Sequence, residues 1–189
     1  MQIANVVRAA FMAAAAIWLA GCASQKETTA ETPPPVIEED VLVLVEVQPV
    51  VDPAVQAVID SGKIDESPEE IRALMEKNTY FFPLNSSKLN DEAYKSLDVH
   101  AAYLTSALGH MKNIVIQGHT DERGTRTYNL ALGERRANAI RDYLIAKGVV
   151  AKRIEVISFG FERPLDPEHN ETAWDLNRRA VIVVNDNTN

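Results

Sequence analysis

The chain has little of three things that would each indicate a class of protein. It has one cysteine in 189 residues, so no disulfide can form within it. It has no excess of positive charge, because 19 Lys and Arg face 27 Asp and Glu, and this argues against nucleic-acid binding. It also lacks an apolar run of the roughly 18 residues that would predict a membrane-spanning helix. The informative features are therefore its N-terminus, its uneven charge and one polar motif.

The N-terminus has the pattern of a secretory signal peptide over residues 1–21. Arg8 is followed by an apolar stretch from Phe11 to Ala20, which is too short to span a bilayer. The small residues directly before Cys22 resemble a lipobox, at which bacterial lipoproteins are cleaved and then acylated on the cysteine. We therefore expect Cys22 to carry the lipid, which would also explain a lone thiol in an exported chain. An ordinary signal peptide with a chance cysteine is the alternative.

Charge divides the rest of the chain into two parts. Residues 23–77 hold 4 basic and 13 acidic side chains, whereas residues 78–189 hold 14 of each. The segment from Gln25 to Asp40 is polar, acidic and contains three consecutive prolines, which is typical of extended, disordered chain. We expect residues 22–77 to form a lipidated, largely disordered acidic tether and residues 78–189 to form the folded domain.

The tether contains three segments with patterns of their own. The valine-rich run from Val41 to Val51 fits a strand or a partner-binding segment. Asp52 before Pro53 predicts a short helix near residues 53–61. Ser67 with Glu70 forms a capping box, which predicts a second helix near residues 68–77.

From Asn78 onward the patterns of strand and helix alternate. The expected helices start after Asn90, near Tyr128 and around Trp174. The order βαβαβ(α)β predicts an α/β two-layer sandwich, with a mixed four-stranded sheet and the helices on one face. The expected strands are residues 79–82, 113–117, 154–159 and 180–184.

A polar loop follows the second expected strand and leads into the longest helix. Asp121 lies in this loop, and Gly124 gives the backbone a permissive position. Asn129 and Arg136 are seven residues apart, so they share one face of the helix. An acid beside a helix start, with an amide and a guanidinium on one face, fits a ligand that carries both an ammonium and a carboxylate.

The chain resembles the OmpA-like peptidoglycan-binding domain family over residues 78–184. The resemblance implies a fold that agrees with the one derived above. It also implies binding to the stem peptide of peptidoglycan at meso-diaminopimelate, without cleavage. The residues that carry it are Gly118-His119-Thr120-Asp121, Gly124-Thr125, Tyr128-Asn129, Leu132, Arg135-Arg136-Ala137, Phe159-Gly160, Pro164 and Asn177-Arg178-Arg179.

The resemblance also assigns roles at the ligand site. Asp121 would take the ammonium of diaminopimelate and Arg136 its carboxylate, with hydrogen bonds added by Thr120 and Asn129. Of the pair that follows Asn177, we place Arg178 at the site, although the sequence leaves open whether Arg178 or Arg179 lines it.

One segment departs from the family pattern. The turn after the first strand usually carries an acid there, and this chain has Pro83 and Asn85 instead. Asn85 keeps a donor and an acceptor but loses the charge, and Pro83 removes a backbone donor. We include Asn85 among the expected ligand-binding residues, and the departure puts any family contact made there by a carboxylate in question.

Other functions fit the residues less well. His119 with Asp121 suggests a metal hydrolase, but His100, His110 and His169 add no dense ligand spacing, so we expect no metal, no cofactor and no enzyme activity. A flagellar stator protein would need a membrane-spanning helix, and a porin would need many alternating strands. A structural lipoprotein that acts only through protein partners remains open.

Together these features predict a lipoprotein held in the outer membrane by acylated Cys22, with its domain in the periplasm. The domain would link that membrane to peptidoglycan. The resemblance further implies TolB and TolA as partners, and roles in envelope integrity and cell division.

Overall fold

The computed structural model describes residues 51–185. The predicted signal peptide, Cys22 and the valine-rich run up to Val50 lie outside these residues. No helix within residues 51–185 has the length and apolar character needed to cross a bilayer. The elements are α1 (Pro53–Asp60), α2 (Pro68–Glu76), β1 (Thr79–Phe81), α3 (Asp91–Thr105), β2 (Asn113–His119), α4 (Arg126–Ala146), the 3-10 turn η1 (Ala151–Arg153), β3 (Ile154–Gly160), α5 (Glu171–Asn177) and β4 (Arg179–Asn185).

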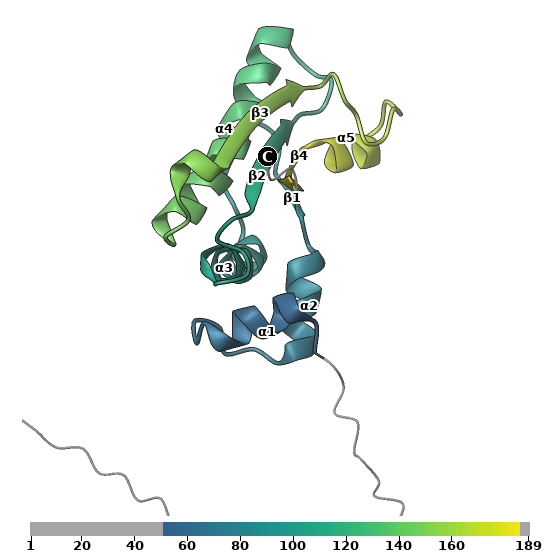
Figure 1. Cartoon of the computed structure of the whole chain (residues 1–189). Helices are drawn as coiled ribbons and strands as arrows, with labels where there is room; N and C mark the ends of the chain where they lie inside the picture. Colours follow the sequence, from purple (N-terminus) through teal and green to yellow (C-terminus); the bar gives the residue numbers. More distant parts are fainter. Residues whose placement is uncertain (1–50, 186–189) are drawn as a thin grey trace, which may run out of the picture. The chain divides into compact units, whose positions relative to one another are not determined.

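The four strands form one mixed sheet in the order β1-β4-β2-β3 (Figure 1). β2 and β3 are parallel, and β4 runs antiparallel to both of its neighbours, β1 and β2. The last strand therefore lies between the first and the second. This arrangement confirms the predicted mixed sheet, and it brings the end of β2 close to the start of β4.

The core lies between one face of the sheet and the helices α3 and α4. Ile114 and Ile116 on β2 and Ala180 and Ile182 on β4 point into it and are almost fully buried. Val115 and Val181, which lie between them, are only partly buried, and the next residue on the same face of β4, Val183, is exposed, as alternation along a strand requires. The two-layer α/β sandwich expected from the sequence is confirmed.

The predicted helix starts have the predicted caps. Asp52 accepts a hydrogen bond from the backbone of Ala54, and Asn90 accepts one from Ala93. Ser67 and Glu70 form the full capping box at α2. Side chains that satisfy the first free N–H groups of a helix explain why these starts could be read from the sequence.

Helices α1 and α2 pack against α3, which differs from the expected tether. Val55 and Val58 of α1 and Ile71 of α2 form a second buried cluster with Val99 and Ala102 of α3. The folded part of the described chain therefore begins near residue 51, and the domain expected to start at residue 78 is extended by two helices. The prediction of a disordered tether rested on the acidic side chains of this segment. Within α1 and α2 these lie on the outer faces of the two helices, whereas apolar side chains on the inner faces make the contacts with α3.

The carbonyl oxygen of Lys77, at the end of α2, is held by three side chains. The hydroxyl groups of Tyr80 and Ser96 donate to it, each at 3.1 Å, and Nε2 of His100 donates at 3.0 Å. These bonds join α2 to β1 and to α3. Burial lowers the pKa of His100, so its ring is neutral in the folded protein near neutral pH.

Candidate functional site

The candidate site is built on the loop of residues 120–125, which joins β2 to α4. Thr125 caps α4 by accepting a hydrogen bond from the backbone of Tyr128, and Gly124 adopts a φ of +106°. Asn129, nearly fully buried on the first turn of the helix, donates through Nδ2 to the carbonyl of Arg123 at 3.0 Å. These contacts fix the second half of the loop to the start of α4.

Two glycines bring α4 close enough to β2 for these contacts. A Cβ atom on Gly118 would lie 1.9 Å from the carbonyl oxygen of Gly133, and one on Gly133 would lie 2.5 Å from Oγ of Ser158. Any larger side chain would push the helix away from the strand. Close backbone packing therefore sets the position of the loop relative to the helix.

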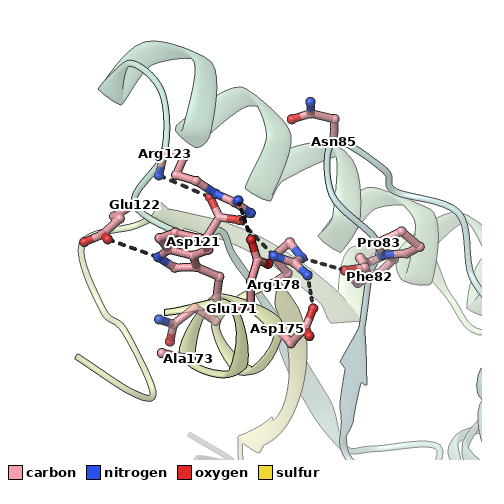
Figure 2. Close-up of polar contacts among 12 residues, drawn as sticks. Phe82, Pro83, Asn85, Asp121, Glu122, Arg123, Glu171, Ala173, Asp175 and Arg178 are labelled. Carbon is pink, nitrogen blue, oxygen red and sulfur yellow. Dashed lines mark hydrogen bonds and ion pairs between the residues drawn. The ribbon is translucent and has the colours of Figure 1, made fainter. Parts of the chain in front are cut away.

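Asp121 is the centre of the site. Its carboxylate is 5% exposed, and its Oδ2 accepts hydrogen bonds from Arg123 Nη2 at 2.8 Å and from Arg178 Nη1 at 3.1 Å. Figure 2 shows both arginines directed at this carboxylate. Burial alone would raise the pKa of Asp121, but the hydrogen bonds from Arg123 and Arg178 outweigh it and lower the pKa. The structure thus presents a buried, ionised carboxylate between two guanidinium groups.

The two neighbouring arginines at the start of β4 have different contacts. Arg178 bonds to Asp121, to Asp175 and, through Nε, to the carbonyl of Phe82 at 3.2 Å (Figure 2). Arg179 donates instead to the carbonyl of Arg163, at 3.2 Å. Of the two arginines, Arg178 thus adjoins Asp121, whereas Arg179 contacts another loop.

Arg136 lies behind the site and is fully buried. Its Nη1 donates to the carbonyl of His119 at 2.7 Å, its Nε to that of Ser86 at 2.9 Å and its Nη2 to that of Pro83 at 3.1 Å. Burial lowers its pKa to about 10. The guanidinium thus joins the end of β2 to the turn of residues 83–86, whereas the family resemblance implies that it binds the carboxylate of a ligand.

That turn forms one wall of a groove of about 530 Å³. Asn85 adopts a φ of +53°, which asparagine tolerates better than most residues, and its Oδ1 accepts a hydrogen bond from Tyr128 at 3.3 Å. The groove is lined by Leu84, Asn85, Arg123, Gly124, Thr125 and Tyr128. The groove thus lies between the turn of residues 83–86 and the loop of residues 120–125.

Arg123 was not among the residues singled out by the sequence. Its guanidinium lies 4.0 Å from the ring centre of Trp174, and its Nη1 is 3.4 Å from Glu171 Oε1. Trp174 in turn donates to Glu122 at 3.0 Å. Two features of the sequence could have indicated a role for Arg123. They are the triplet Asp-Glu-Arg at residues 121–123 and the one aromatic side chain in α5.

The four histidines show no metal-binding arrangement in the part of the chain that the structure describes. There, no group of three or more His, Cys, Asp and Glu side chains is placed to hold an ion. His119 stacks on Phe159, with their ring centres 5.4 Å apart. Cys22, the predicted lipidation site, lies outside the described residues.

Similar proteins match more than half of the chain. The profile of the OmpA family matches residues 81–178. The peptidoglycan-associated lipoprotein of Pseudomonas aeruginosa is 46% identical over 132 residues, which are 70% of this chain and 77% of that protein. The one from Pasteurella multocida is 40% identical over 137 residues, with 69% of this chain and 90% of that protein covered.

A solved structure supports the same comparison. The crystal structure of the peptidoglycan-associated lipoprotein from Burkholderia pseudomallei is 40% identical and has a TM-score of 0.57. The match covers 59% of this chain and 93% of that one. The matched family range, residues 81–178, contains the 120–125 loop, α4 and Arg178.

Proposed function

The chain belongs to the OmpA family, and on that premise we propose that it binds the stem peptide of peptidoglycan at meso-diaminopimelate, without cleaving it. Its similar proteins in P. aeruginosa and P. multocida are named peptidoglycan-associated lipoproteins. The proposal extends the property in that name to this chain and assigns it to the groove beside Asp121.

The observation that carries the proposal is the buried carboxylate of Asp121. It is ionised, it lies among guanidinium groups, and Arg123 beside it lines the groove. The side chain of diaminopimelate ends in an ammonium and a carboxylate on one carbon. In the proposed complex Asp121 binds the ammonium, and an arginine of the surrounding cluster binds the carboxylate, since its planar fork matches two carboxylate oxygens.

The other predicted residues have places in this proposal. In this proposal Thr120 adds a hydrogen bond: its hydroxyl is buried without a hydrogen-bond partner among the described residues, although Thr120 lines a cavity of about 260 Å³ that is separate from the groove. Asn85 lines the groove, while Asn129 fixes the loop. Arg178 holds Asp121 in place.

Arg136 is the carboxylate partner that the family resemblance implies. In this structure two of its nitrogens donate to carbonyls of the 83–86 turn and a third to His119. Arg136 would reach a ligand only after that turn moved away. Its proposed role in binding therefore includes a change in the turn that carries Asn85.

The position in the cell follows from the N-terminus. We propose that Cys22 is acylated, that the lipid anchors the chain in the outer membrane, and that the domain links this membrane to the cell wall from the periplasm. Partnership with TolB and TolA, and roles in envelope integrity and cell division, belong to the same proposal. Its alternative is a lipoprotein that acts only through protein partners.

Co-sedimentation with purified sacculi tests the binding proposal. The wild-type protein should sediment with them, and Asp121→Asn should not, because the amide has no charge to offer an ammonium. Asp142→Asn is the matched control: Asp142 is 65% exposed and pairs only with its neighbour Arg141 among the contacts described. Wild-type protein left in the supernatant would favour the alternative. Muropeptides released from the sacculi would contradict binding without cleavage.

A further inference from the structure

In the described structure Asp121 already has a cation at the position where a ligand ammonium would bind. Arg123 and Arg178 both donate to its Oδ2, at 2.8 and 3.1 Å. Arg178 is 8% exposed and is also held by Phe82 and Asp175. The side chain of Arg123 is 34% exposed. A ligand ammonium can therefore gain access to Asp121 most easily by displacing Arg123.

The remaining contacts of Arg123 allow such a displacement. Its Nε has no hydrogen-bond partner among the described residues, and its bond to Glu171, at 3.4 Å, is long. Its guanidinium rests on Trp174, which supports the plane of the group without fixing its rotation within that plane. Arg123 can therefore leave Asp121 while its guanidinium stays on Trp174. Its N–H groups would then be available to a new acceptor.

We propose that Arg123 holds Asp121 in place of the ligand's ammonium and then transfers to the ligand's carboxylate when the ligand binds. One ion pair, Asp121 with Arg123, becomes two: Asp121 with the ammonium, and the carboxylate with Arg123. The ammonium and carboxylate of diaminopimelate sit on one carbon, so the carboxylate arrives next to the position that Arg123 leaves. This inference rests on the proposed function and names the residue that determines its specificity.

Arg123 suits this role better than Arg136 in the described structure. Arg136 is fully buried, and its three bonds to backbone carbonyls would have to break before it met a carboxylate. Arg123 lines the groove and gives up one ion pair in exchange for another. Its Nε and Nη atoms form the edge that binds a carboxylate with two parallel hydrogen bonds.

The exchange explains how the site would reject lysine. A stem peptide with lysine at the third position brings an ammonium but no side-chain carboxylate. Its binding would displace Arg123 from Asp121 and give Arg123 no new partner in the ligand. Arg123 therefore favours the diaminopimelate peptide over the lysine peptide, so its removal should weaken the first and not the second.

Fluorescence anisotropy with two labelled stem peptides tests this, with the full chain in detergent. For wild-type protein the diaminopimelate peptide should bind more tightly. Arg123→Gln should weaken that peptide by roughly tenfold or more, the loss expected for one charge-assisted pair. The lysine peptide should bind equally well or more tightly, so that discrimination between the two largely disappears. Arg126→Gln is the matched control, because Arg126 lies at the start of α4, is 66% exposed and pairs with Glu162; it should leave the affinity ratio unchanged.

Each outcome decides for or against the exchange. If Arg123→Gln weakens both peptides equally, Arg123 only supports Asp121 and the inference is wrong; an unchanged ratio also overturns it. Circular dichroism shows whether the variant folds, and if it does not, Arg123→Lys should narrow the ratio in the same direction, since lysine keeps the charge and loses the fork. Wild-type protein that binds neither peptide nor sacculi would instead refute the proposed function.

Discussion

The carbonyl oxygen of Lys77 and Nε2 of His100 lie 3.0 Å apart, and this contact ties the end of α2 to α3. Ser96 strengthens the junction, because its hydroxyl also bonds to the carbonyl of Leu74 at 2.9 Å. Helix α2 is thus integral to the folded domain, which makes the region before residue 78 a target for mutation.

Loss of the α2 contact should destabilise the domain. Ile71 is fully buried in the second cluster, so Ile71→Ala should lower the free energy of unfolding by about 2–5 kcal/mol. Glu69→Ala, on the exposed side of the same helix, should change it by less than about 0.5 kcal/mol. Urea denaturation measures both.

The fragment of residues 78–189 alone should have a lower melting temperature than the fragment of residues 51–189. Equal melting temperatures would show that α1 and α2 add nothing.

His119 should make the protein less stable in acid. Burial, together with the charges of Arg179 and Arg163, lowers its pKa to about 4, whereas histidine in an unfolded chain titrates near 6.5. Between these values only the unfolded state takes up the proton, so the free energy of unfolding falls as the pH falls. The loss approaches about 3 kcal/mol by pH 4.

Thermal melts of wild type and His119→Gln from pH 4 to pH 8 check this prediction. The variant should lose less stability than wild type on acidification, with the difference confined to the range below about pH 6.5. A residual slope is expected from His100, whose pKa is also lowered by burial. Identical slopes for the two proteins would contradict the assignment to His119.

Arg136 should matter to stability as well as to binding. Arg136→Ala removes three hydrogen bonds to backbone carbonyls, one of them buried, and leaves a cavity where a fully buried side chain stood, so we expect a loss of roughly 3 kcal/mol or more. Arg135→Ala next to it is exposed and should cost less than about 0.5 kcal/mol. Urea denaturation compares the two. A stable Arg136→Ala protein that fails to bind sacculi would show that Arg136 serves the ligand and not the turn.

Cys22→Ser tests the anchor. A protein with several acyl chains is held stably in a membrane, and one without them is not. The variant should stay uncleaved or be released from the outer membrane, with the same circular dichroism as wild type. Recovery with the outer membrane at the wild-type level would refute lipidation at Cys22.

Local signals explain which parts of the fold could be predicted. Asp52, Ser67 and Asn90 each satisfy free N–H groups at a helix start, so they mark a position without knowledge of the rest of the chain. The packing of α1 and α2 on α3 has no such signal. It depends on contacts of Val55 and Ile71 with residues about 30 to 45 positions later in the chain. Charge and proline content do not indicate such contacts.

The site divides in the same way. Helical spacing correctly placed Asn129 and Arg136 on one buried face, but spacing does not tell whether that face meets a ligand or the chain's own backbone. The close approach of the 83–86 turn decides this for Arg136. Arg123 was missed because its importance comes from Trp174, some 50 residues away in the sequence and 4.0 Å away in space.

The second apolar cluster also has a mechanical consequence. Any force along the chain from its N-terminal side enters the described domain at α1, and the contacts of α1 and α2 with α3 bear the load before the sheet does. If these contacts broke, residues 51–77 could extend to a length of up to roughly 90 Å. Asp121, Arg123 and the groove lie outside α1 and α2. The proposed ligand site would therefore stay intact after these two helices had detached.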